Sequence, residues 1–75
     1  MQYPSKIMSL RQLMRECGFP ERYLERAYRS PGQKFATKAN PTARNSPILF
    51  DTDGFERWRQ REIAAQERAQ RRGLG

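Results

Sequence analysis

The sequence predicts a mostly α-helical domain with a small β-hairpin: two short helices, two strands and a C-terminal helix. Two stretches with apolar residues at helical spacing flank a turn of Gly18, Phe19 and Pro20. A polar segment bounded by two apolar runs follows, and a last helical stretch opens with Phe55 and Trp58. The 75 residues suffice for one domain with a small core, because a chain of this length buries only about 60% of its unfolded surface.

The first helix is predicted to begin at Leu10 and to end at Gly18. Ser9 is suited to accept from the backbone amide of Gln12, whose side chain can reach back to the Ser9 amide. Glycine ends the helix because it adopts the left-handed conformation without steric cost. The apolar residues of this helix are Leu10, Leu13, Met14 and Cys17, and the outward residues are Arg11, Gln12, Arg15 and Glu16.

The second helix is predicted from about Pro20 to Arg29. Proline is favoured at a helix start, since the amide hydrogen that it lacks has no partner there. Leu24, Ala27 and Tyr28 are expected to face inward, whereas Tyr23 fits either face. Two helices joined by so short a turn form a helix-turn-helix, whose second helix enters the DNA major groove. The residues expected to point outward are Glu21, Arg22, Glu25, Arg26 and Arg29.

A β-hairpin is predicted after a break at residues 30–32, Ser-Pro-Gly. Residues 34–38 alternate polar with apolar side chains, and residues 47–50 form a second apolar run. Residues 39–43 between them, Ala-Asn-Pro-Thr-Ala, have the composition of a turn. Lys38 and Arg44 therefore lie near the tip of the hairpin, which is the place of the wing in a winged helix-turn-helix.

The third helix is predicted to begin near residues 51–53, Asp-Thr-Asp, which offer caps and suit the positive end of the helix dipole. Phe55 and Trp58 are expected to seal the core, with stacking on bases as the alternative. From Ala64 onward good helix formers continue without an apolar stripe. The predicted divisions are an N-terminal arm at residues 1–8, the DNA-binding domain at residues 9–63, and a polar helical extension or disordered tail at residues 64–75.

The composition favours a polyanionic partner and argues against several other classes of protein. Fifteen Lys and Arg against eight Asp and Glu give a net charge of +7, which favours nucleic acid. Without histidine or a second cysteine, Cys17 is expected to be a buried structural thiol, with no metal site. No apolar run indicates a membrane helix or signal peptide, so a cytoplasmic protein is expected. No catalytic constellation is visible, so neither an enzyme nor a cofactor is expected.

The candidate DNA-binding residues lie on the second helix and the hairpin. Arg22, Arg26 and Arg29 share one helix face, and cations that project together displace the counterions condensed on DNA. Arginine also contacts guanine through two hydrogen bonds. The alternatives are a solvated Arg/Glu helix face and an ordinary polar turn. The hairpin supplies donors suited to a phosphate strand or the minor groove, namely Lys34, Thr37, Lys38, Arg44, Asn45 and Ser46.

Several motifs in order along the chain carry a resemblance to a known family. They are Ser9-Leu10-Arg11-Gln12-Leu13, the turn at Gly18-Phe19, the helix end at Tyr28-Arg29, the run Ser46-Pro47-Ile48-Leu49-Phe50-Asp51, and Phe55 with Trp58. The run from residue 9 to residue 58 resembles the excisionase-like and MerR-like winged helix-turn-helix proteins of phages and integrative elements. The resemblance implies base reading by Arg22, Tyr23 and Arg26. It implies backbone contacts from Arg29, Lys34, Lys38 and Arg44.

The leading hypothesis is a sequence-specific binder of double-stranded DNA that acts as an excisionase-like accessory factor, with an integrase or recombinase as second partner. A small transcriptional regulator with the same fold is one alternative, and a protein-interaction module is another. RNA binding is less favoured, because no aromatic platform on a sheet is indicated. The last helix lacks sustained heptads, so a monomer or a cooperative assembly on DNA is expected in a bacterial or phage-encoded, nucleoid-associated protein.

Overall fold

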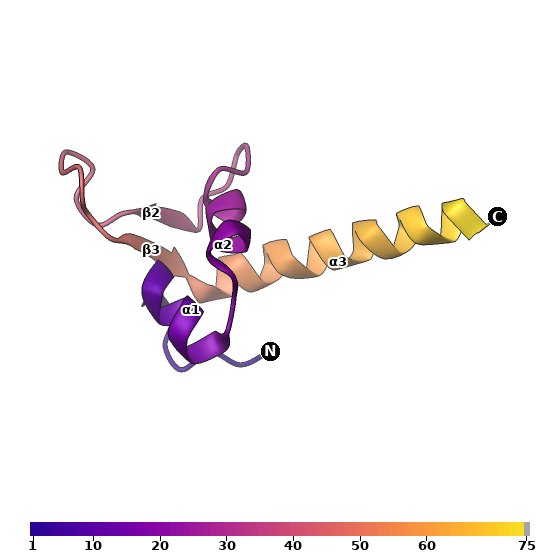
Figure 1. The fold of residues 1–75 in the computed structure, drawn as a ribbon, viewed down its shortest axis with the longest axis horizontal. Helices are drawn as coiled ribbons and strands as arrows, with labels where there is room; N and C mark the ends of the chain where they lie inside the picture. The colour runs from indigo at the N-terminus through magenta and orange to yellow at the C-terminus, as the bar shows by residue number, and fades with distance from the viewer. Residues whose placement is uncertain (75) are drawn as a thin grey trace.

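The computed structural model describes the backbone of residues 1–74 and the side chains of residues 1–70. Within that range the chain forms three helices and one three-stranded antiparallel sheet (Figure 1). A mostly helical domain with a small sheet is therefore confirmed, but the sheet has three strands instead of the two expected. In chain order the elements are β1 (Ile7–Ser9), α1 (Leu10–Cys17), α2 (Glu21–Tyr28), β2 (Ala36–Lys38), β3 (Ile48–Asp51) and α3 (Thr52–Leu74).

Local signals set the ends of the two short helices. The Ser9 hydroxyl accepts from the Gln12 amide at 3.1 Å, and the Gln12 side chain accepts from the Ser9 amide at 2.8 Å. Gly18 follows α1 in the left-handed conformation, with φ of 76°. Pro20 precedes α2 without a side-chain cap, and Arg29 follows its last residue. Both predicted helices are thus confirmed to within about one residue at each end.

The strand β1 comes from the segment that the sequence placed in an N-terminal arm. The strand order is β1-β3-β2, so β3 pairs on both edges. Met8 lies opposite Phe50 and is 1% exposed, while Ala36 lies opposite Phe50 on the other edge. Three residues are too few to show the alternation that identifies a strand, and pairing with a partner about 40 residues later stabilises this one.

The core lies where α1, α2, the sheet and the first turns of α3 meet. Phe55 is fully buried, and its ring centroid lies 5.3 Å from that of Phe50 and 5.4 Å from that of Phe19. The core role predicted for Phe55 and Trp58 is therefore confirmed, because rings buried in this way do not face a ligand. The buried apolar residues are Met8, Leu13, Leu24, Ala27, Phe35, Ala36, Phe50, Phe55 and Trp58.

The start of α3 is tied to the N-terminal segment and to the loop before β2. The Thr52 hydroxyl donates to the carbonyls of Ser5 and Lys6 at 2.9 and 2.8 Å. The Asp51 carboxylate accepts from the Asp53 amide at 3.1 Å, as expected of a helix cap. From this anchored start α3 runs well beyond the other elements (Figure 1), so that the molecule with α3 included measures 49 × 25 × 18 Å. None of the described helices combines the length and apolar character needed to cross a membrane.

Candidate nucleic-acid interface

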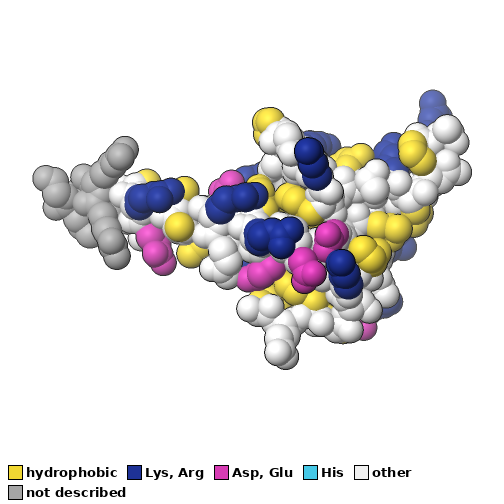
Figure 2. Space-filling view, turned by 180° about the vertical axis from the view of Figure 1, so that it is seen from behind, with side chains coloured by type: hydrophobic (Ala, Val, Ile, Leu, Met, Phe, Trp, Pro, Cys, Tyr) yellow, Lys and Arg dark blue, Asp and Glu magenta, His cyan; other side chains and the backbone are white. Residues whose placement is uncertain are grey.

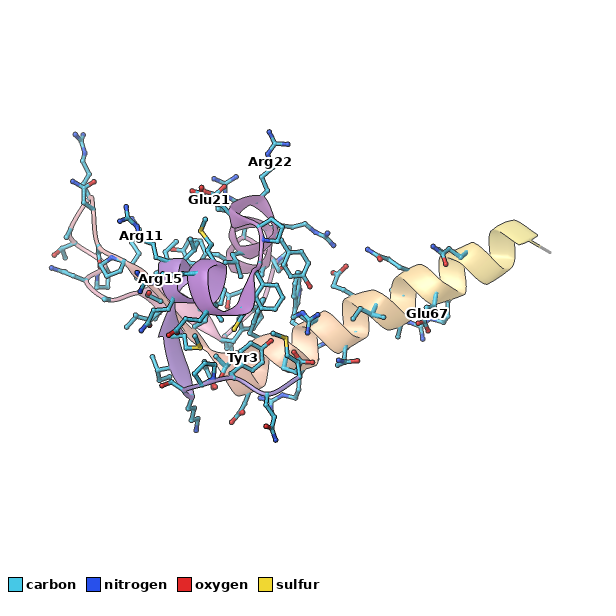
Figure 3. All side chains as sticks on the ribbon, turned by 60° about the horizontal axis from the view of Figure 1, so that its bottom comes forward. Tyr3, Arg11, Arg15, Glu21, Arg22 and Glu67 are labelled. Atoms are coloured by element: carbon cyan, nitrogen blue, oxygen red, sulfur yellow. The ribbon has the colours of Figure 1, made fainter. Side chains whose placement is uncertain are left out.

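A cationic surface is formed by the two short helices. Arg11 and Arg15 lie one turn apart on α1, Arg22 lies in the first turn of α2, and all three are exposed. Burial of Leu13 and Leu24 turns these polar faces away from the core. In Figure 3, Arg11 and Arg22 project to the side on which the β2–β3 loop also projects. We call Arg11, Arg15 and Arg22 the α1–α2 basic face.

The arginines of the α1–α2 basic face have no ion-pair partner among the described side chains, whose ion pairs join other groups. Arg11 and Arg15 border a hollow that Glu21 also lines, and Arg22 borders one that Glu25 also lines, so two carboxylates belong to this surface. Three hydrated guanidinium groups that form no ion pair with a described side chain are suited to bind the oxygens of phosphates, each through two hydrogen bonds.

The loop between β2 and β3 has a defined conformation, because its own polar groups hold it closed. The Asn40 amide donates to the Ser46 hydroxyl at 2.6 Å, and the Asn40 side chain accepts from the Thr42 amide at 3.1 Å and hydroxyl at 2.8 Å. Ser46 was expected to donate to DNA, but here it braces the loop. Arg44 and Asn45 are exposed between these contacts, as the wing prediction requires.

The β2 candidates lie where this strand enters the loop. Thr37 is exposed, and Lys38 is half-buried. Lys38 pairs with Ile48 across the strands, which places it at the end of the ladder nearest the loop. Lys38 therefore lies at the base of the loop that carries Arg44 and Asn45, and the Thr37 side chain is on the opposite face of the sheet from that of Lys38.

Arg26 departs from the prediction. Its guanidinium forms an ion pair with Glu62 of α3 at 2.5 Å and lies 5.7 Å from the centroid of the Trp58 ring. Arg22 and Arg26 are both exposed and line one hollow, as their spacing predicts, but the expectation that Arg26 has no acidic partner is wrong. The cause is a tertiary contact: α3 carries Glu62, which is 36 residues later in the sequence, and packs it against α2.

Tyr23 lies on the core side of α2. Its ring stacks on Phe19 at 5.7 Å between centroids and lies 5.5 Å from Trp58. A half-buried ring engaged on two sides does not accompany Arg22 on the exposed face, so the structure corrects its assignment as a base reader. Helical periodicity alone did not decide whether Tyr23 lies on the buried or the exposed face of α2.

The remaining candidates line two neighbouring hollows. Arg29 follows the end of α2 and lines a hollow with Arg22. Lys34 is exposed and lines a different hollow, between the loop before β2 and α3. Among the described residues, one hollow therefore brings Arg22, Arg26 and Arg29 together, and Lys34 lines the neighbouring hollow, which shares Ser30 and Pro31 with it.

Arg11 and Arg15 were not among the predicted site residues, although their spacing places both on the outer side of their helix. Their spacing of four was the signal, because it puts two cations on one face immediately before the turn that leads to Arg22. Cys17 is half-buried, and burial, together with the charge of Glu16, raises the pKa of its thiol. The neutral thiol therefore predominates and is a poor nucleophile.

A second polar cluster holds the N-terminal segment against α3. The Tyr3 hydroxyl donates to the Glu56 carboxylate at 2.6 Å, Arg59 donates to it at 2.7 Å, and the Arg59 guanidinium lies 4.9 Å from the centroid of the Phe19 ring. Burial and the hydrogen bond to Glu56 raise the pKa of Tyr3 far above its ordinary value. Glu56 is satisfied by Tyr3 and Arg59, and Arg59 Nε is buried without a hydrogen-bond partner among the described residues. Because its charged groups pair with one another, we assign the cluster to stability.

No protein family, curated protein or solved structure matches this chain. Any functional conclusion therefore rests on the chemistry of its own surfaces. The feature that distinguishes the described surface from an ordinary solvated one is a set of arginines from two consecutive helices, unpaired by acids and placed on the side of a braced loop.

Proposed function

We propose that this protein binds double-stranded DNA through the α1–α2 basic face and the β2–β3 loop. The observation that carries the proposal is the placement of Arg11 and Arg22, on consecutive helices, on the side where the loop projects (Figure 3). Counterion release by several cations on one surface is the main source of affinity for duplex DNA. An exposed loop beside a helix-turn-helix suits contact with the adjacent backbone or minor groove.

Within this proposal some residues contact base edges and others contact the phosphate backbone or hold α2 in place. Arg22 lies in the first turn of α2, and the N-terminal residues of a recognition helix are those that contact base edges. Arg11 and Arg15 bind phosphates and set the register of α2 in the major groove. Arg44 in the loop extends the contact along the backbone. Arg26 joins α2 to α3 through its ion pair with Glu62 and so helps to hold α2 in place.

We assign the binding to an excisionase-like accessory role, in which a small protein bends or marks DNA for a recombinase. The motif order from Ser9 to Trp58 supports this role. A small transcriptional regulator would use the same face, and the two roles differ in the outcome on DNA and not in the contacts. Both roles begin with sequence-specific binding to duplex DNA, and this step can be tested directly.

Selection of bound sequences from a randomised duplex pool tests sequence-specific binding. The wild-type protein is expected to enrich one motif, and Arg22→Ala to weaken binding to that motif by about 1–3 kcal/mol. The double variant Arg11→Ala/Arg15→Ala is expected to weaken binding to all duplexes and to reduce the slope of log K against log salt by about 2. Fluorescence anisotropy across about 50–200 mM salt measures both quantities.

Lys6→Ala is the matched control, because it also removes one exposed cation. Lys6 lines a hollow with the N-terminal segment and the start of α3, away from the α1–α2 basic face. Its removal is expected to change the affinity little. Absence of duplex binding at low salt, or equal losses in Lys6→Ala and Arg22→Ala, would refute the proposal.

A further inference from the structure

A second set of cations runs along α3. Arg57, Arg61 and Arg68 are exposed, and at about 100° per residue they lie within about 40° of one another around the helix axis. We call these three residues the α3 stripe. Figure 2, which shows the molecule from behind, displays Lys and Arg side chains in a row along this helix.

The α3 stripe and the α1–α2 basic face lie on opposite sides of the molecule. Arg59 is about 160–200° around the helix from each residue of the stripe, by the same helical geometry. Since Arg59 packs on Phe19, in the turn between α1 and α2, the stripe points away from that turn. In Figure 3, in which the bottom of Figure 1 comes forward, Arg11 and Arg22 project towards the top of the picture, and Figure 2 shows the row of Lys and Arg side chains along α3 from behind.

Among the acids of α3, Asp53 lies about 40° around the helix from Arg57 and lines a hollow with it, so one carboxylate borders the first residue of the stripe. The other acids are engaged elsewhere or lie to one side. Glu56 is engaged by Tyr3 and Arg59, and Glu62 by Arg26, so both serve contacts with the body of the domain. Glu67 lies about 100° around the helix from Arg68. No residue of the stripe has an ion-pair partner among the side chains that the structure describes.

Lys34 extends the positive surface at the base of the stripe. It lines one hollow, of about 490 Å³, together with Arg57 and Arg61. Asp51 and Glu62 also line this hollow; the Asp51 carboxylate accepts from the Asp53 amide as a cap of α3, and Glu62 forms the ion pair with Arg26. Three cations from two segments thus converge where α3 leaves the body of the domain.

The chemistry of the stripe fits a phosphate backbone better than an acidic protein. Protein interfaces draw most of their affinity from buried aromatic and other large anchors. Between Arg57 and Arg68 the face of the stripe carries only Ala64 in addition. The cations are spaced about 6 Å and about 10 Å apart along a rigid helix, and all three are arginines, the side chain best shaped for phosphate.

We propose that the α3 stripe, with Lys34, binds the phosphate backbone of a second duplex segment, so that one molecule bridges two segments of DNA. This inference rests on the proposed function, because the first segment occupies the α1–α2 basic face. A straight duplex seated on that face does not reach the opposite side of the body. A duplex on the α3 stripe is therefore a separate segment of DNA. Because the stripe contacts phosphates, this second contact has no sequence preference.

A capture assay tests the bridge. A duplex with the selected motif is immobilised on beads and loaded with full-length protein, and recovery of a fluorescent duplex of unrelated sequence is measured at about 50 mM salt. The wild-type protein is expected to recover the second duplex. The variant Arg57→Ala/Arg61→Ala/Arg68→Ala is expected to load normally and to recover at least tenfold less. The triple lysine variant at the same positions keeps the charge and is expected to retain most of the recovery.

Each outcome decides one of the two proposals. Normal loading with no recovery by the wild-type protein, or equal recovery by the triple alanine variant, would overturn the bridge while leaving the first duplex contact intact. Failure of the wild-type protein to load onto the beads would overturn the proposed function itself. Circular dichroism of each variant checks that the helices persist, as expected for substitutions at exposed positions.

Discussion

Glu56→Gln removes the charge at the centre of the cluster that holds the N-terminal segment on α3. The Glu56 carboxylate accepts from Tyr3 at 2.6 Å, from Arg59 at 2.7 Å and from Gln60 at 2.7 Å, and the terminal amine of Met1 lies 3.7 Å away. Burial alone would raise the pKa of Glu56. The hydrogen bonds and the charge of Arg59 outweigh burial and lower this pKa to about 2.

The magnitude follows from the linkage between ionisation and folding. A carboxyl whose pKa falls from its ordinary 4.5 to about 2 on folding contributes about 3 kcal/mol to the free energy of unfolding. Because the folded pKa is depressed, this contribution is fully present above about pH 5 and is lost as the pH falls towards 2. The Glu56 side chain is 19% exposed, so water screens it only in part.

Urea unfolding followed by circular dichroism at pH 7, 5, 3 and 2 measures this contribution. Glu56→Gln is expected to be less stable than the wild-type protein by about 1–3 kcal/mol at pH 7, because the amide keeps part of the hydrogen bonding. The difference is expected to vanish near pH 2. The control Glu62→Gln breaks an ion pair whose arginine is 54% exposed, and it is expected to cost less than about 1 kcal/mol. A difference at pH 7 that equals the one at pH 2 would refute the reasoning.

Three further substitutions test the packing and the helix signals. Gly54→Ala places a Cβ 2.7 Å from that of Phe35, so it is expected to destabilise by about 1–3 kcal/mol despite the better helix propensity of alanine; a raised melting temperature would contradict this. Ser9→Ala removes the cap of α1 and is expected to cost about 1 kcal/mol in urea unfolding, whereas an unchanged midpoint would mean that the capping box is dispensable. Arg26→Ala loses only an exposed ion pair and the contact with Trp58, so anisotropy should show a smaller loss of duplex affinity than for Arg22→Ala; the reverse order would show that Arg26 is a reader.

Much of the fold could be predicted because its signals are local. The capping box at Ser9 and the left-handed Gly18 act within four residues, so the sequence places the first helix correctly. The apolar spacing of Leu13 and Leu24 likewise indicates which sides of α1 and α2 are buried. For the same reason Arg22 was correctly expected to be exposed. Hydrogen bonds and side-chain spacing within one helical turn do not depend on the rest of the chain.

The candidate site was less predictable, because its composition depends on contacts between distant segments. Arg22 and Arg26 share a helix face by spacing, but Glu62 approaches from α3 and engages Arg26 alone. The periodicity of α2 cannot reveal a carboxylate that arrives 36 residues later. The strand β1 is a similar case, since β3 supplies its hydrogen bonds.

By itself the sequence determined the two short helices, the caps, the core role of Phe55 and the excess of positive charge, because each follows from local geometry or composition. Only the tertiary structure decided how that charge is distributed. Packing of α3 against α2 pairs the exposed Arg26 with Glu62, half-buries Tyr23, and leaves Arg11, Arg15 and Arg22 without a salt bridge on one side. The same packing turns Arg57, Arg61 and Arg68 to the other side, because a helix anchored through Trp58 and Arg59 must expose the opposite face.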